Sequence, residues 1–433
     1  MDDTPATDTA AERRRAESIG FLRELIMAQP EGEEAVQARV AAAAAAAGCV
    51  VESVRHRPMQ VPMVAEFAAA GAIDEGERLS VVARLAGAGG GPSVVLFAHP
   101  DGEPIAGIEH WRHKPFAGEI DQGRIHGWGV ADDLAGVAIM VEALATLSAA
   151  GLRLRGDVIL ASTPSKRHAR GVSALMHGGL AADAAIYLHP AESGAGMREI
   201  KAFASGQVEF RVVVAGKLPD TNEPSHTAFS HQAVNPFSKA ILVHAALEEL
   251  GARRGTRVRH PALEKAVGRS TNILVSSVSC GPPGTHSRIA PECVLYCALS
   301  FPPPETLASV QSEVAEAIAR AATRDPWLAA NPPRIEWVSG VTGAEVPDTH
   351  PLYATVAAAI RAVTRTEPYV NPMHTSSDIR NPIVQKGIPT VGLGPLCGDL
   401  AQNGRHDEWV DVDDYLRAIK VVARTIAAWC GTA

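Results

Sequence analysis

The sequence has few cysteines, few aromatic residues and no excess of positive charge. Its six cysteines among 433 residues form no CxxC pair, so neither a disulfide framework nor a cysteine-based zinc site is expected, and we predict a reduced, cytoplasmic protein. Forty Lys and Arg oppose 48 Asp and Glu, a net charge of −8. Because phosphate binding requires clustered positive charge, nucleic acid is not an expected partner. No apolar run approaches the ~18 residues of a membrane span, so no membrane partner is expected.

The composition is that of a globular protein, with 46% apolar and 20% charged residues. At roughly 100–200 residues per domain, the length predicts two or three domains. Residues 1–14 begin with acidic side chains and contain no apolar core. We therefore expect a solvated, disordered tail there rather than a secretion signal.

Strand-like and helical segments alternate over much of the chain. The segments 93–98, 157–162 and 184–188 are apolar enough to be central strands, and 135–150 has a helical pattern. Strands that alternate with helices predict an α/β sheet with crossover connections, and continuously apolar strands are typically covered on both faces.

The pattern changes after residue 203. Strand-like and helical segments then follow the order β-α-β-β-α-β, at 208–214, 235–250, 272–278, 293–299, 306–322 and 334–338. This order is typical of a ferredoxin-like domain. We therefore predict a ferredoxin-like lid and dimerisation domain at 204–342, inserted into a discontinuous α/β catalytic domain formed by 15–203 and 343–433.

Polar residues with useful chemistry follow three of the apolar strands, namely His99, Ser165, Lys166 and His189. Ligands of α/β sheets bind outside the carboxyl ends of the strands, so these side chains are candidates for one site. His99 is followed two residues later by Asp101, and a histidine beside a carboxylate suits a metal ligand whose ring is oriented from behind. Short motifs of this kind are also common in ordinary loops.

Further motifs give the pattern a family resemblance. The order and spacing of HxDxxP, WxxxPF and a glycine-rich DxxG motif resemble the family of zinc-dependent aminoacylases, carboxypeptidase G and succinyl-diaminopimelate desuccinylase. The resemblance covers nearly the whole chain, and the segments that carry it are 99–104, 111–116, 127–136, the HTAFSHQAVNP of 226–236, 376–378 and 407–410.

This resemblance implies roles for individual residues. It identifies His99, Asp132 and His189 as metal ligands and Asp101 as the carboxylate that orients His99. It also implies a cis peptide after Asp132, before Asp133. The lid residue His226 is expected to reach the active site of a partner subunit and to stabilise an oxyanion, which requires a homodimer through the lid domain. Substrate contacts are expected from Asn235, Arg288 and Ser377.

The chain departs from the family at the second metal position. Two adjacent glutamates of the family, the general base and a ligand, are replaced by Ser165 and Lys166, and the last histidine ligand falls on Asn403 or Gly404, with His406 two residues too close. The family's substrate-clamping arginine becomes Ser300. Both residues that bind only one of the family's two metal ions are thus lost, and those that bind only the other ion are kept. The resemblance therefore implies one zinc per protomer, or none.

We predict an amidohydrolase or exopeptidase-like enzyme that acts on a small amide, such as an N-acyl amino acid or a dipeptide. The expected catalytic side chains are Asp101, Ser165, Lys166 and His226, and Glu192 or His168 could replace the lost base. Two alternatives stay open. The chain could catalyse a non-hydrolytic reaction such as acyl transfer, condensation, cyclisation or elimination, or it could be a non-catalytic homologue that binds a ligand. In a relic pocket without metal, Lys166 would pair with Asp132.

Overall fold

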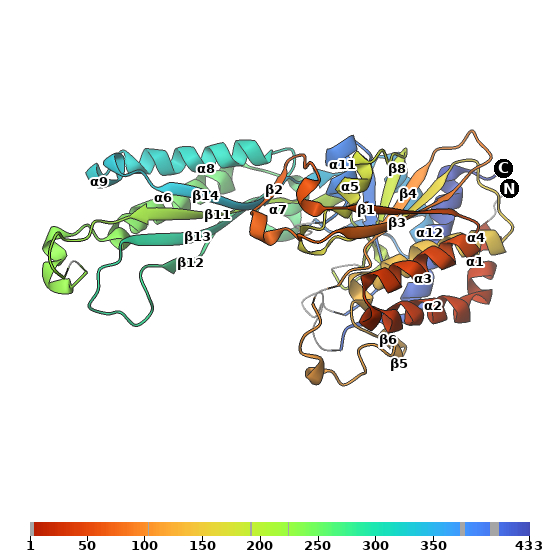
Figure 1. The fold of residues 1–433 in the computed structure, drawn as a ribbon. Helices are drawn as coiled ribbons and strands as arrows, with labels where there is room; N and C mark the ends of the chain where they lie inside the picture. The colour runs from red at the N-terminus through yellow and green to blue at the C-terminus, as the bar shows by residue number, and fades with distance from the viewer. Residues whose placement is uncertain (1–3, 103, 191–192, 224, 373–376, 399–406) are drawn as a thin grey trace. The chain divides into compact units, whose positions relative to one another are not determined.

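The computed structural model describes residues 4–102, 104–190, 193–223, 225–372, 377–398 and 407–433 (Figure 1). The chain divides into two compact units. One, called here the α/β unit, consists of Met1–Val64, Ala70–Phe203 and Glu345–Ala433. The other, called the insert unit, consists of Ala65–Ala69 and Ala204–Ala344.

A six-stranded mixed sheet forms the centre of the α/β unit. Its strand order is β1 (Val50–His56), β3 (Arg78–Leu85), β7 (Val158–Ser162), β4 (Val94–Ala98), β8 (Ala184–Leu188) and β17 (Thr390–Leu393). The strand β4 runs parallel to β7 and β8, and β17 continues the parallel part beside β8. Every residue of β4, β7 and β8 is buried, as expected for strands covered on both faces. The predicted α/β sheet is confirmed.

Helices of the α/β unit cover this sheet. They are α1 (Thr4–Arg13), α2 (Arg15–Ala28), α3 (Glu33–Ala46), α4 (Ala135–Ala149), α5 (Gly171–His177), α10 (Pro351–Thr364), α11 (Arg380–Lys386) and α12 (Val412–Cys430). The central helix, α4, is apolar on nearly all sides and is buried between β4 and α12, where an all-apolar helix belongs. Among the described residues, no helix is both long and apolar enough to cross a bilayer.

The prediction of a disordered tail is wrong for residues 4–14. Helix α1 packs against α4 and α12, and its Ala10 and Ala11 are buried. Asp8 accepts two hydrogen bonds from Arg424 of α12, at 2.8 and 2.6 Å. The small residues let the helix approach its neighbours closely, and the charged ones find partners instead of water. A charged, alanine-rich segment was therefore mistaken for a solvated one.

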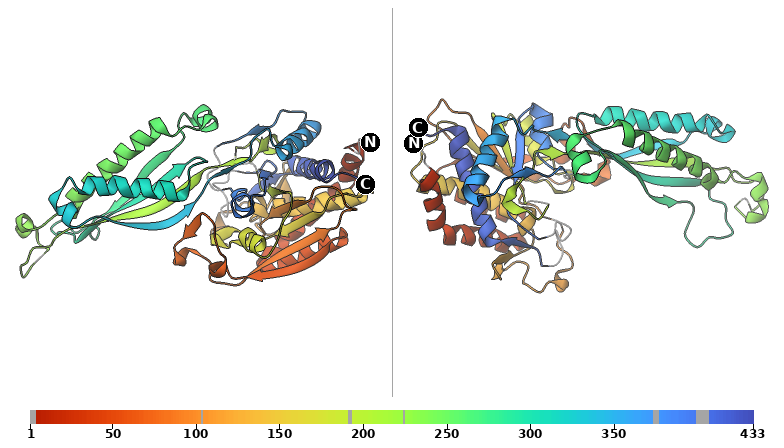
Figure 2. Two further views of the ribbon diagram at one scale, coloured as in Figure 1. Left: turned by 90° about the horizontal axis from the view of Figure 1, so that it is seen from above. Right: turned by 180° about the vertical axis from the view of Figure 1, so that it is seen from behind.

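The insert unit is an antiparallel sheet with two long helices, α6 (Pro236–Arg257) and α8 (Leu307–Ala322), which lie side by side (Figure 2). Its strand order is β12 (Asn272–Ser279), β13 (Glu292–Phe301), β11 (Gly206–Ala215), β14 (Arg334–Val341) and β2 (Glu66–Ala68). Along the chain, α6 lies between β11 and β12, and α8 lies between β13 and β14. This is the β-α-β-β-α-β order of ferredoxin-like folds. Two short helices, α7 (Pro261–Val267) and α9 (Pro326–Ala330), complete the unit.

The strand β2 corrects the expected domain boundary. Residues 65–69 were assigned to the α/β domain, but β2 pairs with β14 at the edge of the insert sheet. Phe67 packs there against the apolar core of the insert unit. A side chain at Gly340 would come within 2.4 Å of the Phe67 ring, so the glycine leaves the space that Phe67 fills. A three-residue strand far away in the sequence has no pattern that reveals its partner.

The buried guanidinium of Arg254 in α6 gives a stability prediction for the insert unit. It is 1% exposed and pairs with Glu305 at 2.6 Å and with Glu313. Replacing one partner of a buried ion pair leaves the others uncompensated, so Arg254→Ala should lower the free energy of unfolding by about 3–5 kcal/mol. The neighbouring Arg253 is exposed and pairs with Glu249, so Arg253→Ala should cost less than about 1 kcal/mol. Urea unfolding of both variants checks this, and equal effects would contradict it.

Candidate active site

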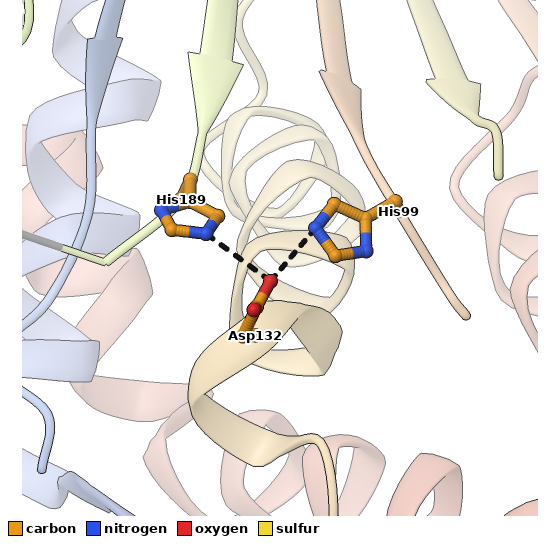
Figure 3. Close-up of side chains that lie close together, drawn as sticks. All are labelled: His99, Asp132 and His189. Carbon is orange, nitrogen blue, oxygen red and sulfur yellow. Dashed lines mark hydrogen bonds and ion pairs between the residues drawn. The ribbon is translucent and has the colours of Figure 1, made fainter. Parts of the chain in front are cut away.

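Two histidines and an aspartate meet at the carboxyl end of the central sheet (Figure 3). His99 directly follows β4 and His189 directly follows β8. Because these strands are parallel neighbours, their ends bring the two rings to the same edge. The Nε2 atoms of His99 and His189 lie 2.9 and 3.2 Å from the same oxygen, Oδ1 of Asp132. All three side chains are buried.

Asp132 lies in a tight turn, Val130–Leu134, that leads into α4. The carboxylate of Glu408 holds this turn, because it accepts the N–H groups of Gly129 at 2.9 Å and Ala131 at 2.7 Å. The peptide between Asp132 and Asp133 is cis, as the family resemblance implies. Glu408 is 1% exposed. The sequence indicated its motif but not this role.

Asp101 lies beside Nδ1 of His99. The Nδ1 atom of His99 is 3.0 Å from the main-chain oxygen of Asp101 and 3.5 Å from its carboxylate. That carboxylate also accepts the N–H groups of Ser165 and Lys166, each at 2.9 Å, and a hydrogen bond from Arg78 at 3.1 Å. Asp101 therefore fixes the ring of His99 and ties it to the loop after β7.

Burial and close contacts have opposite effects on the pKa values of these groups. Burial alone would lower the pKa of His99, but hydrogen bonds to Asp101 and Asp132 outweigh it and raise that pKa well above its usual value. Burial would raise the pKa of Asp132, yet hydrogen bonds from His189 and His99 hold it well below its usual range. For Asp133 burial prevails, and its pKa is raised well above the ordinary value. Of the two adjacent aspartates, Asp132 is therefore the one whose ionised form is favoured.

Two lysines flank this cluster. The ammonium of Lys166 forms an ion pair with Oδ2 of Asp132, the oxygen that the histidines leave unused. The Nζ atom of Lys201, a residue 1% exposed, lies 2.6 Å from Nδ1 of His189. No sequence pattern singled out Lys201, because a lone lysine in an apolar segment is indistinguishable from a surface residue of a half-exposed strand.

The donor set fits one metal ion. Two imidazole nitrogens and a carboxylate oxygen are typical zinc ligands, and one open position completes a catalytic site. The donor atoms of His99, Asp132 and His189 all lie within 4.8 Å of one another. A second dication beside Asp132 would meet the positive charge of Lys166, and like charges at that distance repel. Asn403, Gly404 and His406 lie outside the described residues.

Ser165 has an unexpected partner. Its hydroxyl donates to Oδ2 of Asp378, whose Oδ1 accepts a hydrogen bond from Asn381 at 3.1 Å. Asp378 belongs to the closing motif of 376–378, but sequence separation hid its proximity to Ser165. Ser377 is buried, and its hydroxyl accepts from the N–H of Ile379 at 3.5 Å. Glu192 lies outside the described residues.

Three predicted residues lie in the insert unit. The Nδ1 atom of His226 accepts the N–H of Ala228 at 3.1 Å, and the backbone of His226 pairs with that of Arg288 in an isolated β-bridge. The side chain of Asn235 caps α6, because its oxygen accepts the N–H of Phe237 at 3.0 Å. Asn235 thus has a structural task whether or not it contacts a substrate. The substrate and catalytic roles of these residues stay predictions.

Comparison with known proteins agrees with the resemblance. The family model described as Peptidase family M20/M25/M40 matches residues 95–428. The N-formyl-4-amino-5-aminomethyl-2-methylpyrimidine deformylase of Bacillus subtilis is 26% identical over 78% of this chain and 79% of its own length. The succinyl-diaminopimelate desuccinylase of Alkalilimnicola ehrlichii is 27% identical over 78% of this chain and 84% of its own length.

Solved structures share the fold. The M20 family metallo-carboxypeptidase of Sulfolobus solfataricus superposes with a TM-score of 0.68 at 15% identity, covering 96% of this chain and 98% of the other. A Bacillus subtilis protein described as a dinuclear metal binding peptidase from the M20 family gives a TM-score of 0.63 at 14% identity, covering 98% and 100%. The recognition made from the sequence is confirmed.

Gly136, at the start of α4, provides a test of how tightly the Asp132 turn is seated. A side chain there would come within 2.0 Å of the Leu188 main-chain oxygen and 2.5 Å of Asp133. We expect Gly136→Ala to destabilise the protein by about 1–3 kcal/mol, as overpacking typically does. Gly20 in α2 has no atom within 4 Å of such a side chain, so Gly20→Ala should stabilise by about 0.4–1 kcal/mol. Thermal unfolding measures both, and a neutral Gly136→Ala would contradict the close packing.

Proposed function

Because this chain belongs to the peptidase family M20/M25/M40, whose relatives act on amide C–N bonds, we propose that it hydrolyses a small amide at a centre with at most one metal ion. The observation that carries the proposal is that the Nε2 atoms of His99 and His189 converge on Oδ1 of Asp132. The ion pair of Lys166 with Oδ2 of Asp132, which is also the contact expected of a pocket without metal, argues against a second ion. The cluster of His99, Asp132 and His189 retains the donors for one ion. The ammonium of Lys166 occupies the position beside it.

The substrate we favour is an N-acylated amine, such as an N-acyl amino acid. The two named relatives are a deformylase and a desuccinylase, and both names describe the removal of an acyl group. A dipeptide presents the same bond and is the second choice. The charge of Lys166, whose side chain is 20% exposed, suits a substrate oxygen that gains negative charge.

The chain's own residues prepare the site. His99, Asp132 and His189 would hold the ion, and Asp101 fixes the ring of His99. A bound zinc supplies Lewis acidity and lowers the pKa of a water. Lys166 keeps one oxygen of Asp132 neutralised, which limits the negative charge that the buried cluster would otherwise carry.

Proton transfer requires a substitute for the missing glutamate base, and we assign it to Asp378 acting with Ser165. The Ser165 hydroxyl donates to Asp378, so Ser165 can pass its proton to this carboxylate while it accepts one from the attacking water. Return of that proton through the same pair to the departing amine leaves both groups as they began. A positioned carboxylate of this kind contributes about 10²–10⁴-fold to the rate.

We extend the proposal to the insert unit. There, His226 would stabilise the oxyanion in the active site of a partner subunit, with the homodimer formed through this unit. Support comes from the motif at 226–236 and from the pairing of His226 with Arg288. Arg288 would then face a carboxylate of the substrate.

The metal ligands give the first test. His99→Ala and Asp132→Asn should each remove one equivalent of zinc and lower amide hydrolysis by more than about 10²-fold, because a metal ion supplies several kcal/mol of transition-state stabilisation. Elemental analysis and release of formate or succinate from N-acyl amino acids provide the measurements. His110→Ala, at an exposed histidine, serves as the control. Unchanged hydrolysis in either ligand variant would refute the proposal, and turnover without hydrolysis would favour a non-hydrolytic reaction.

The proton-transfer assignment has its own test. Asp378→Asn should lower kcat by about 10²–10⁴-fold, the contribution of a general base, with a much smaller change in KM. Ser165→Ala should act in the same direction. Asp413→Asn, which alters an exposed carboxylate paired with Arg15, should leave kcat unchanged. If Asp378→Asn retains full kcat, the base is another group.

A further inference from the structure

A second group of metal-binding side chains lies in the α/β unit, outside the cluster described above. It sits on a small sheet of three strands, β5 (Glu119–Asp121), β6 (Arg124–His126) and β18 (Trp409–Asp411). His113, Asp121 and His126 each present a ligand atom, and these atoms lie within 4.8 Å of one another. The three residues line a pocket of about 280 Å³ together with Arg112, Gln122, Arg124, Asp407 and Trp409.

His126 is the buried member of this group. It is 6% exposed, and its Nδ1 atom has no hydrogen-bond partner in the part of the chain that the structure describes. Buried polar atoms in folded proteins nearly always have a partner, and an exception calls for an explanation such as a bound ion.

His113 has a carboxylate beside one ring nitrogen, as metal-binding histidines commonly do. Its Nδ1 atom lies 3.3 Å from the carboxylate of Glu119, and Glu119 stands opposite His126 in the β5–β6 hairpin. A carboxylate on one ring nitrogen fixes the proton there and directs the lone pair of the other nitrogen outward. The rings of His113 and His126 stack with centroids 3.7 Å apart and planes at 16°. A shared ion lies in both ring planes, so binding requires the His113 ring, 23% exposed, to turn.

Two arginines that line the pocket have partners within it. The guanidinium of Arg124 lies over the Trp409 ring at 3.8 Å, and that of Arg112 pairs with Asp407 at 3.1 Å. The exposed carboxylate of Asp121 then stands beside two imidazoles. Two histidines and an aspartate form a donor set that selects zinc and similar divalent transition metals over calcium or magnesium.

We infer that His113, Asp121 and His126 form a second site for a divalent transition-metal ion, distinct from the His99, Asp132 and His189 cluster. The carboxylate of Asp407 connects this site to the segment that holds the Asp132 turn. Asp407 accepts the N–H groups of Arg112 at 2.8 Å and His113 at 3.1 Å, and the next residue, Glu408, holds the turn. An ion at this site cross-links the 112–113 segment to the β5–β6 hairpin and stabilises the contact of that segment with Asp407. Its role is structural rather than catalytic.

The test is zinc binding to the metal-stripped full chain without a polyhistidine tag. The variant His99→Ala/Asp132→Asn lacks the first cluster and should still bind one equivalent of zinc in isothermal titration. Adding His113→Gln and Asp121→Asn should weaken that binding by more than about tenfold, the scale of effect that even a residue behind a ligand has. His110→Gln changes a 72% exposed histidine of the same segment and should not alter binding.

A second arm avoids the buried ligands. In the otherwise unchanged chain, Asp121→Asn alone should lower the zinc stoichiometry by one equivalent or weaken one binding phase, while thermal unfolding without metal stays the same. Zinc binding that responds to Asp121→Asn no more than to His110→Gln would overturn the inference. Binding lost only with His99 and Asp132 would also overturn it and leave the proposed function standing. Binding lost only with His113 and Asp121 would instead refute the metal assignment of the first cluster.

Discussion

The chemistry of this protein depends on how the two oxygens of Asp132 are shared. Oδ1 faces the Nε2 atoms of both histidines, and Oδ2 forms an ion pair with Lys166. An ionised carboxylate this deeply buried needs positive partners, because an unpaired buried charge is costly. In a dinuclear centre the second partner would be a metal ion, whereas in this chain it is a lysine side chain. The lysine supplies the positive charge at that oxygen, which is why we propose at most one ion for this centre.

The fold prepares this arrangement before any ligand arrives. Parallel pairing of β4 with β8 brings His99 and His189 to one edge of the sheet. Glu408 gathers the N–H groups of the Asp132 turn, and Gly136 lets that turn lie against the end of β8. These contacts come from segments far apart in the sequence. The site is therefore a product of sheet topology, and its ligands are held by the same packing that stabilises the α/β unit.

Residues with a strong local signal were predictable, and those defined by distant partners were not. The apolar runs of β4, β7 and β8 identified the sheet, and polar residues at their ends identified His99, Lys166 and His189. The pairing of Ser165 with Asp378 and the position of Lys201 beside His189 depend on tertiary contacts. Helix α1 was missed for a related reason: its small, charged sequence becomes a packed helix only because α4 and α12 offer a surface and Arg424 a partner.

The most direct test of a single-ion centre is a zinc-soaked crystal examined by anomalous scattering at the zinc edge. One peak among His99, Asp132 and His189, with the Lys166 ammonium still on Asp132, is the result that this account predicts. Two peaks bridged by Asp132, at the roughly 3.5–4 Å separation of two-metal sites, would contradict it, because Lys166 would then have yielded its place to a second ion.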